Sequence, residues 1–87
     1  MSKSLRTPLQ QQLRNTLAGL RKAKNLTQAD LALKLGRPQS FVAKYEVGER
    51  RLDVVEFIEV AHALEVDPSL LLAELIKNSA DNQSENA

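Results

Sequence analysis

Residues Gln28 to Val47, QADLALKLGRPQSFVAKYEV, decide the fold because they have the pattern of two short helices joined by a sharp turn. Apolar residues share one face of each helix at helical spacing: Leu31, Ala32 and Leu35 on the first, and Val42 and Tyr45 on the second. This spacing predicts two amphipathic helices that pack against a common core.

The turn between the two helices is marked by Gly36 and Pro38. Glycine lacks a Cβ atom and therefore suits the left-handed conformation that often ends a helix. Proline prevents the first helix from continuing and is tolerated in the opening turn of the second. Ala32 places a small side chain where the two helices would cross closely. Together these residues predict a helix-turn-helix.

The arrangement resembles the helix-turn-helix of the Cro and phage-repressor type, called the Xre family. The matching residues are Gln28, Ala32, Gly36, Val42, Tyr45, Glu46 and Gly48. The resemblance extends from about Leu13 to Leu71 and implies an all-α, five-helix lambda-repressor-like DNA-binding domain. Its second and third helices would form the motif. Arg37 departs from the pattern where the family usually has an apolar residue, and Ala43 departs where a polar residue is common.

Length and composition limit the protein class. The chain has 87 residues, enough for one domain with a modest core, and it has no cysteine for a disulfide or a thiolate metal site. No apolar run is long enough for a signal peptide or a membrane span, so we expect a cytoplasmic protein. The domain is expected over residues 8–77, between a flexible basic arm at residues 1–7 and a disordered polar tail at residues 78–87.

Charge is segregated along the chain although the net charge is only +1. Residues 1–51 carry eleven lysines and arginines against three acids, a net +8, whereas residues 52–87 carry one lysine against eight acids, a net −7. This asymmetry favours a face for a polyanion, although charged residues also serve simply to solvate a surface. In the basic arm, Lys3 and Arg6 either reach a DNA groove or belong to a terminus with no role.

Capping residues define the helix starts. Thr7 is expected to cap a helix from Pro8 to Lys24, whose inner stripe is Leu9, Leu13, Leu17 and Leu20. Thr27 with Asp30, and Asp53 with Glu56, form capping-box patterns. The helix after Asp53 is expected to bury Val54, Phe57, Ala61 and Leu64. Asp67-Pro68 starts the last helix.

The resemblance places the amino end of the helix that follows Pro38 in the major groove. The expected DNA-binding residues are Gln28, Arg37, Gln39, Ser40, Phe41, Lys44, Arg50 and Arg51. Gln39, Ser40 and Lys44 have groups that can bind base edges, whereas Arg50 and Arg51 would bind phosphates. Gln28 either meets a phosphate at a helix amino end or is solvated. Phe41 either contacts a thymine methyl or packs sideways near Val47.

The resemblance also implies a partly buried ion pair between Arg21 and Glu46. A dimer interface is expected on the last helix, because a short terminal helix cannot bury all of its apolar residues on one side. The expected interface residues are Val66, Leu71, Leu72, Leu75 and Ile76.

No residue pattern indicates catalysis, a metal or a cofactor. His62, the one histidine, is expected at the surface, and Glu56 and Glu59 are expected to solvate their helix. The sequence therefore favours a homodimeric, sequence-specific transcription regulator of the repressor kind, with double-stranded DNA as its partner. The alternative is an antitoxin-like or adaptor module that binds another protein.

Overall fold

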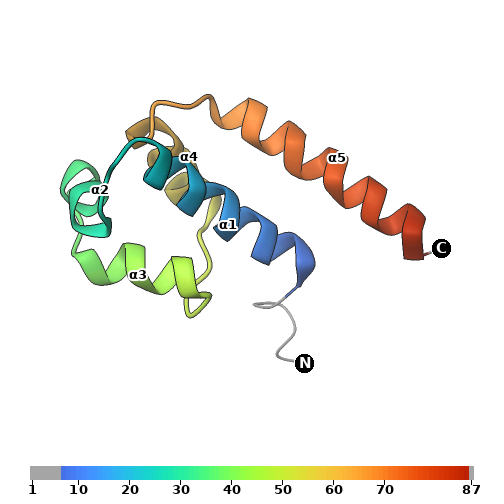
Figure 1. Ribbon diagram of the computed structural model, residues 1–87, viewed down its shortest axis with the longest axis horizontal. Helices are drawn as coiled ribbons and strands as arrows, with labels where there is room; N and C mark the ends of the chain where they lie inside the picture. Colours follow the sequence, from blue (N-terminus) through green and yellow to red (C-terminus); the bar gives the residue numbers. More distant parts are fainter. Residues whose placement is uncertain (1–6, 87) are drawn as a thin grey trace.

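The computed structural model describes the backbone of residues 7–86 and the side chains of residues 7–79. Within that range it contains five helices and no strand: α1 (Pro8–Ala23), α2 (Gln28–Leu35), α3 (Gln39–Val47), α4 (Val54–Ala63) and α5 (Pro68–Asn86) (Figure 1). The predicted all-α, five-helix architecture is confirmed. Apart from Thr7, the predicted basic arm lies outside the described residues.

Side-chain caps start three of the helices where the sequence places them. The hydroxyl of Thr7 accepts a hydrogen bond from the backbone N–H of Gln10, at 3.1 Å. Complete capping boxes join Thr27 to Asp30 and Asp53 to Glu56. These contacts satisfy N–H groups that a helix leaves free at its amino end. The structure therefore confirms the predicted starts of α1, α2 and α4.

Residues with a left-handed backbone conformation follow each of the first four helices. Gly36 has a φ of 68° after α2 and Gly48 a φ of 87° after α3, as predicted. Asn25 and Glu65 also have positive φ values, of 60° and 62°. Asparagine tolerates this conformation better than most residues, whereas glutamate gives no local signal for it. The turn at Glu65 therefore depends on the packing of the helices on either side.

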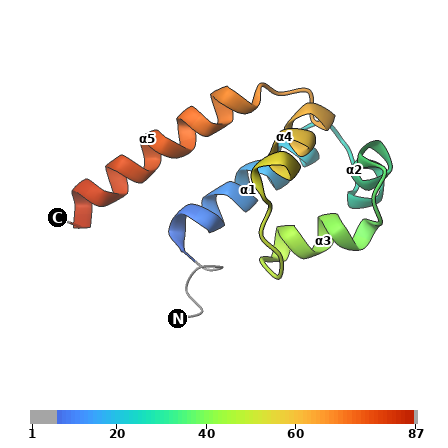
Figure 2. The ribbon, with the colours of Figure 1, turned by 180° about the vertical axis from the view of Figure 1, so that it is seen from behind.

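Core residues come from the first four helices and from Leu64, the C-cap of α4. The buried apolar residues are Leu17, Leu31, Ala32, Phe41, Val42, Tyr45, Val60, Ala61 and Leu64. Helix α2 packs on α3 and α4, while α1 packs on α3 and α5. Seen from behind, α4 lies between α1 and α2 (Figure 2). The expectation that Val54 is buried is wrong, since 73% of it is exposed. It begins α4, beyond the turns that the neighbouring helices cover.

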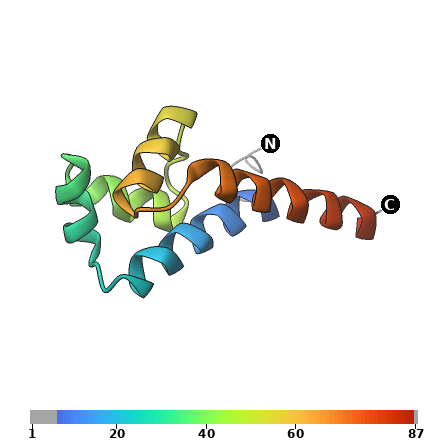
Figure 3. The same cartoon turned by 90° about the horizontal axis from the view of Figure 1, so that it is seen from above.

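Helix α5 is longer than the sequence suggests. It continues past residue 77, through the segment expected to be a disordered tail, and ends at Asn86. No glycine or proline follows Pro68, so no strong breaker stops the helix. Its carboxyl end runs beyond the amino end of α1 (Figure 3). None of the described helices has the length and apolarity needed to cross a membrane.

Candidate nucleic-acid interface

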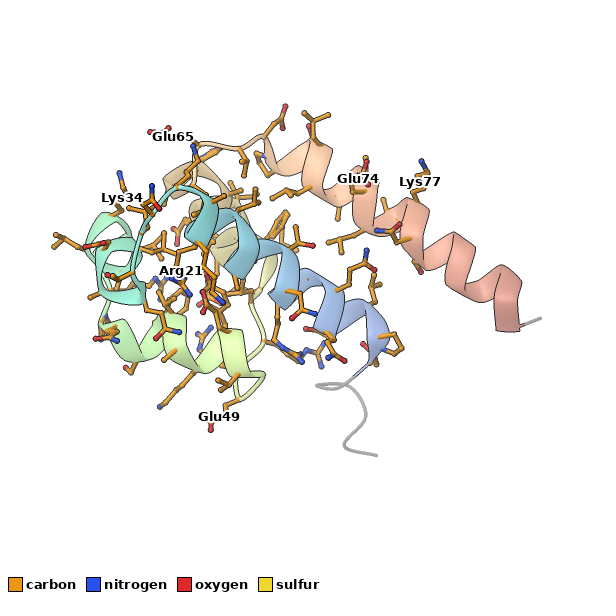
Figure 4. All side chains as sticks on the ribbon, viewed as in Figure 1. Arg21, Lys34, Glu49, Glu65, Glu74 and Lys77 are labelled. Carbon is orange, nitrogen blue, oxygen red and sulfur yellow. The ribbon has the colours of Figure 1, made fainter. Side chains whose placement is uncertain are left out.

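The carboxyl end of α3 is held by a paired arginine and glutamate. Arg21 on α1 donates from Nε to Oε2 of Glu46 at 2.8 Å and from Nη2 to Oε1 at 3.0 Å. The two side chains are 9% and 8% exposed. Arg21 also donates to the carbonyl of Leu26 at 2.7 Å, and Figure 4 shows it between α1 and α3. The ion pair that the resemblance implied is therefore present, with the bidentate geometry that makes such pairs strong.

Gln28 joins this pair from the amino end of α2. Its Nε2 donates to Oε1 of Glu46 at 2.9 Å, and the side chain is half-buried. Burial alone would raise the pKa of Glu46, but the hydrogen bonds from Arg21 and Gln28 outweigh burial and hold the pKa below its ordinary value. Gln28 is therefore not simply solvated, because part of its hydrogen-bonding capacity is used within the fold. Its contact with Glu46 links the first turn of α2 to α3.

The outer surface of α3 carries polar side chains. Gln39, Ser40 and Lys44 are exposed, as predicted, and Ala43 is half-buried. The opposite face of the helix is anchored in the core by Val42 and Tyr45. A helix fixed on one face and polar on the other presents its side chains in a defined orientation, which sequence readout requires.

Tyr45 anchors α3 with its ring rather than with its hydroxyl. The residue is 1% exposed, and its hydroxyl oxygen has no hydrogen-bond partner among the residues that the structure describes. Burial raises the pKa of this hydroxyl above its ordinary value, so the group stays neutral. The hydroxyl of Tyr45 therefore contributes no hydrogen bond to the anchoring of the helix.

Phe41 does not lie on the exposed face of α3. It is 7% exposed and its ring meets that of Tyr45 edge to face, with 5.6 Å between the centroids. The expectation of an exposed aromatic is therefore wrong, and the ring packs inward rather than sideways near Val47. The physical reason is helical spacing, because residues four apart share a face and Tyr45 already points to the core.

Arg37 and Arg50 flank Phe41 instead of extending freely into solvent. Their Cζ atoms lie 4.5 Å and 5.0 Å from the centroid of the Phe41 ring. Arg50 donates to both carboxylate oxygens of Glu56, at 2.8 Å and 2.7 Å. Arg37 lies 3.7 Å from Glu56 and 3.4 Å from Glu59. The structure thus brings two predicted DNA-binding arginines together in an internal ion-pair network.

Glu56 has a larger structural role than its sequence pattern indicates. It caps α4 as predicted, but it is 7% exposed and does not simply solvate its helix. The hydrogen bonds from Arg50, with help from the backbone N–H of Asp53, lower its pKa to about 2. The capping pattern was the only local signal for it. Among the other expected contacts, Arg51 is exposed and lies within the loop between α3 and α4.

The expected dimer residues separate into two groups. Val66 and Leu71 are half-buried and pack against the core of their own chain. Leu72 and Ile76 are exposed and Leu75 is half-buried. These three line a groove of about 420 Å³ between α1 and α5, with Leu9 and Leu13 on its other side.

The described residues contain no group of three or more histidine, aspartate or glutamate side chains that could hold a metal ion. His62 is exposed on α4, as expected. Glu59 faces Arg37 rather than a second carboxylate poised for acid–base work.

Comparisons with known proteins agree with this geometry. The helix-turn-helix family model matches residues 17–71. An XRE-family like protein from Pseudomonas syringae pv. tomato str. DC3000 is 43% identical, with a TM-score of 0.80 over 87% of this chain and 93% of that one. The restriction-modification controller protein C.AhdI from Aeromonas hydrophila is 34% identical, with a TM-score of 0.64 over 70% of this chain and 91% of that one.

A mutant of the restriction-modification controller protein C.Esp1396I is 26% identical, with a TM-score of 0.74 over 85% of this chain and 94% of that one. A comparison with curated proteins found no significant match. The family model covers more than half of the chain and places both helices of the motif within its range. The chain therefore belongs to the Xre family of helix-turn-helix proteins, a family of DNA-binding transcription regulators.

Proposed function

We propose that this protein represses transcription by binding a two-fold DNA site as a homodimer, with the amino end of α3 in the major groove. One observation carries the proposal: Gln39, Ser40 and Lys44 project from a helix whose opposite face is buried. The Arg21–Glu46 pair holds the far end of the same helix. Two relatives named as restriction-modification controllers support a regulatory role. A repressor acts where the DNA is, in the cytoplasm.

In this proposal some exposed side chains contact base edges and others contact phosphates of the DNA backbone. Gln39 pairs twice with an adenine, Ser40 donates to or accepts from a base edge, and Lys44 reaches a guanine or a phosphate. Gln28 uses its remaining amide proton and the α2 amino end for a phosphate. Arg51, which is exposed, binds a second phosphate.

The dimer follows from the limits of a single recognition helix. One helix reads only a few base pairs, and a two-fold pair of half-sites provides the missing specificity. The groove between α1 and α5, with exposed Leu72 and Ile76, supplies an apolar surface for a second copy. Soluble monomers seldom expose such a patch without use.

Selection of bound sites from random DNA, followed by gel-shift titration, tests the DNA proposal. Gln39→Ala should weaken binding to the selected site by about 1 to 3 kcal/mol and relax the choice at one base pair. Arg51→Ala should weaken selected and random DNA alike and flatten the salt dependence by about 0.9 units of slope. If Gln39→Ala weakens every sequence equally and Arg51→Ala alters base preference, then α3 does not read the groove.

Sedimentation at micromolar concentration tests the dimer. Ile76→Glu should convert two-chain particles to single chains and weaken binding to the selected site, because a buried charge opposes the apolar contact. Leu33→Glu is the matched control, since Leu33 is 83% exposed on α2, away from the groove. A single-chain particle that binds no DNA would support the antitoxin-like or adaptor function instead. Reporter expression with and without the protein decides between repression and activation.

A further inference from the structure

Four charged residues beside the recognition helix form a chain of ion pairs, here called the arginine–glutamate cluster: Arg37, Arg50, Glu56 and Glu59. Two arginines and two glutamates give the cluster a formal charge of zero. Glu56 lies at its centre, within 2.7 Å of Arg50 and 3.7 Å of Arg37. Glu59 contacts Arg37 alone and is about half exposed.

The cluster is built on Phe41, immediately after the residues proposed to read bases. Both guanidinium groups lie over the Phe41 ring, and the ring packs on Tyr45 in the core. A guanidinium over an aromatic face is attracted by the ring electrons. The cluster therefore connects the turn before α3, α3 itself and the first turns of α4.

We propose that Glu56 is a positioning residue that keeps Arg50, and with it Arg37, on Phe41 and away from DNA phosphates. This role rests on the proposed DNA binding through α3. It reverses the assignment made from sequence, in which Arg37 and Arg50 contact DNA. Glu56 then sets the ratio between binding to the preferred site and binding to random DNA.

Electrostatics explains why such a counter-ion matters. A free arginine beside the interface attracts any phosphate backbone and adds affinity without sequence choice. A bidentate carboxylate partner neutralises the charge and fixes the guanidinium plane. The pKa of Glu56, about 2, keeps the carboxylate ionised at every pH used for DNA binding.

The variant Glu56→Gln separates the charge from the cap. The glutamine amide oxygen can still accept the hydrogen bond that the backbone N–H of Asp53 donates to Glu56 at 3.0 Å. The negative charge is lost, so Arg50 becomes available to a phosphate, while Arg37 keeps Glu59. The expected result is tighter binding to random DNA and a salt slope steeper by about 0.9 units. A fourfold rise in salt should then weaken the variant about three to four times more than the parent protein.

Two further variants distinguish this role from a structural one. Adding Arg50→Gln to Glu56→Gln should return the salt slope to that of the parent, which simple loss of stability would not do. In the parent background, Arg50→Gln should leave the slope unchanged, whereas Arg51→Gln should flatten it by about 0.9 units. Circular dichroism at the assay temperature verifies that each variant is folded.

The proposal is overturned if Glu56→Gln leaves both the slope and the ratio of selected to random binding unchanged. It is also overturned if Arg50→Gln flattens the slope as much as Arg51→Gln, because Arg50 would then be a phosphate ligand. If Glu56→Gln does not fold, the comparison of Arg50→Gln with Arg51→Gln is sufficient by itself to support or overturn the proposal. These outcomes require a parent protein that binds DNA, so they are distinct from the failure of the proposed function, in which the parent binds none.

Discussion

Replacing Arg21 with alanine should severely destabilise the domain. The substitution removes both hydrogen bonds to Glu46 and the donor to the Leu26 carbonyl. Glu46 then keeps only the amide of Gln28, while its side chain, 8% exposed in the intact protein, still lies between helices. The variant therefore retains a carboxylate that is short of both solvent and partners.

The size of the loss in unfolding free energy follows from the Glu46 carboxylate, which Arg21→Ala leaves without its charged partner. Breaking a buried ion pair by removing one partner costs about 3 to 5 kcal/mol. We expect about 3 kcal/mol, because solvent can enter the space left by the deleted guanidinium. A domain is stable by only about 5 to 15 kcal/mol, and each kcal/mol moves the Tm of a 60–100-residue domain by roughly 4 to 8 °C. The expected loss in Tm is therefore about 12 to 24 °C.

Urea unfolding followed by circular dichroism measures this change, and the same α1 carboxyl end provides a control. Lys24 pairs with Glu65 at 3.4 Å, but the two side chains are 37% and 73% exposed. Lys24→Ala should cost no more than about 1 kcal/mol, the upper range for an exposed pair. The double variant Arg21→Ala with Glu46→Ala should lose less than the sum of the two single variants. Strict additivity, or equal losses for Arg21→Ala and Lys24→Ala, would refute the reasoning.

The same reasoning predicts a pH dependence. In the intact protein the pKa of Glu46 lies below its ordinary value of 4.5, so its contribution to stability is present above pH 4.5 and is lost as the pH falls through the lowered pKa. Without Arg21, burial dominates and raises the pKa of Glu46 instead. The variant then gains stability by binding a proton as the pH falls. The difference between parent and variant should therefore be smaller at pH 4 than at pH 7, and a constant difference would argue against a stranded charge.

Three further predictions concern the core and the turns and use the same unfolding assay. Leu17→Ala should cost about 2 to 5 kcal/mol because Leu17 is fully buried, whereas Leu33→Ala, at an exposed position, should stay within about 0.5 kcal/mol. Tyr45→Phe should not destabilise, because it deletes a buried hydroxyl that has no hydrogen-bond partner, and a loss above about 1 kcal/mol would contradict that description. Gly48→Ala should cost more than Gly36→Ala: both have positive φ, but a Cβ at Gly48 would also come within 3.0 Å of a guanidinium atom, whereas a Cβ at Gly36 meets nothing within 4 Å.

Local signals in the sequence determined where most helices begin and end. Thr7, Thr27 and Asp53 satisfy N–H groups within three residues of themselves, and Gly36 and Gly48 adopt a conformation that most other residues resist. Such interactions are complete within one turn of chain, so they can be recognised without knowing the fold. The Arg21–Glu46 pair was different, because its two residues are 25 positions apart and only the family resemblance connected them.

The tertiary structure decided which charged and aromatic residues near α3 are paired within the fold and which stay exposed. Phe41 is four residues before Tyr45, so its inward position was visible in the spacing, but the arginines above it were not. Arg37 and Glu56 are separated by 19 positions, and their contact exists only because α2, α3 and α4 pack together. Whether a basic residue near α3 stays free for a ligand therefore depends on which carboxylates the fold brings within reach of it.

The tertiary structure also decided which apolar residues of α5 remain exposed. This helix contains more apolar residues than one small core can cover, which predicted that some of them stay exposed. Leu72 and Ile76 are exposed, in agreement with that prediction. Periodicity could not separate these residues from Leu71, which packs on its own core, because the helix is apolar nearly all round. Only the position of α1 against α5 determines which side of the helix is covered. A short sequence can specify helices and their caps by local interactions, but the face that remains for a partner depends on contacts between distant segments.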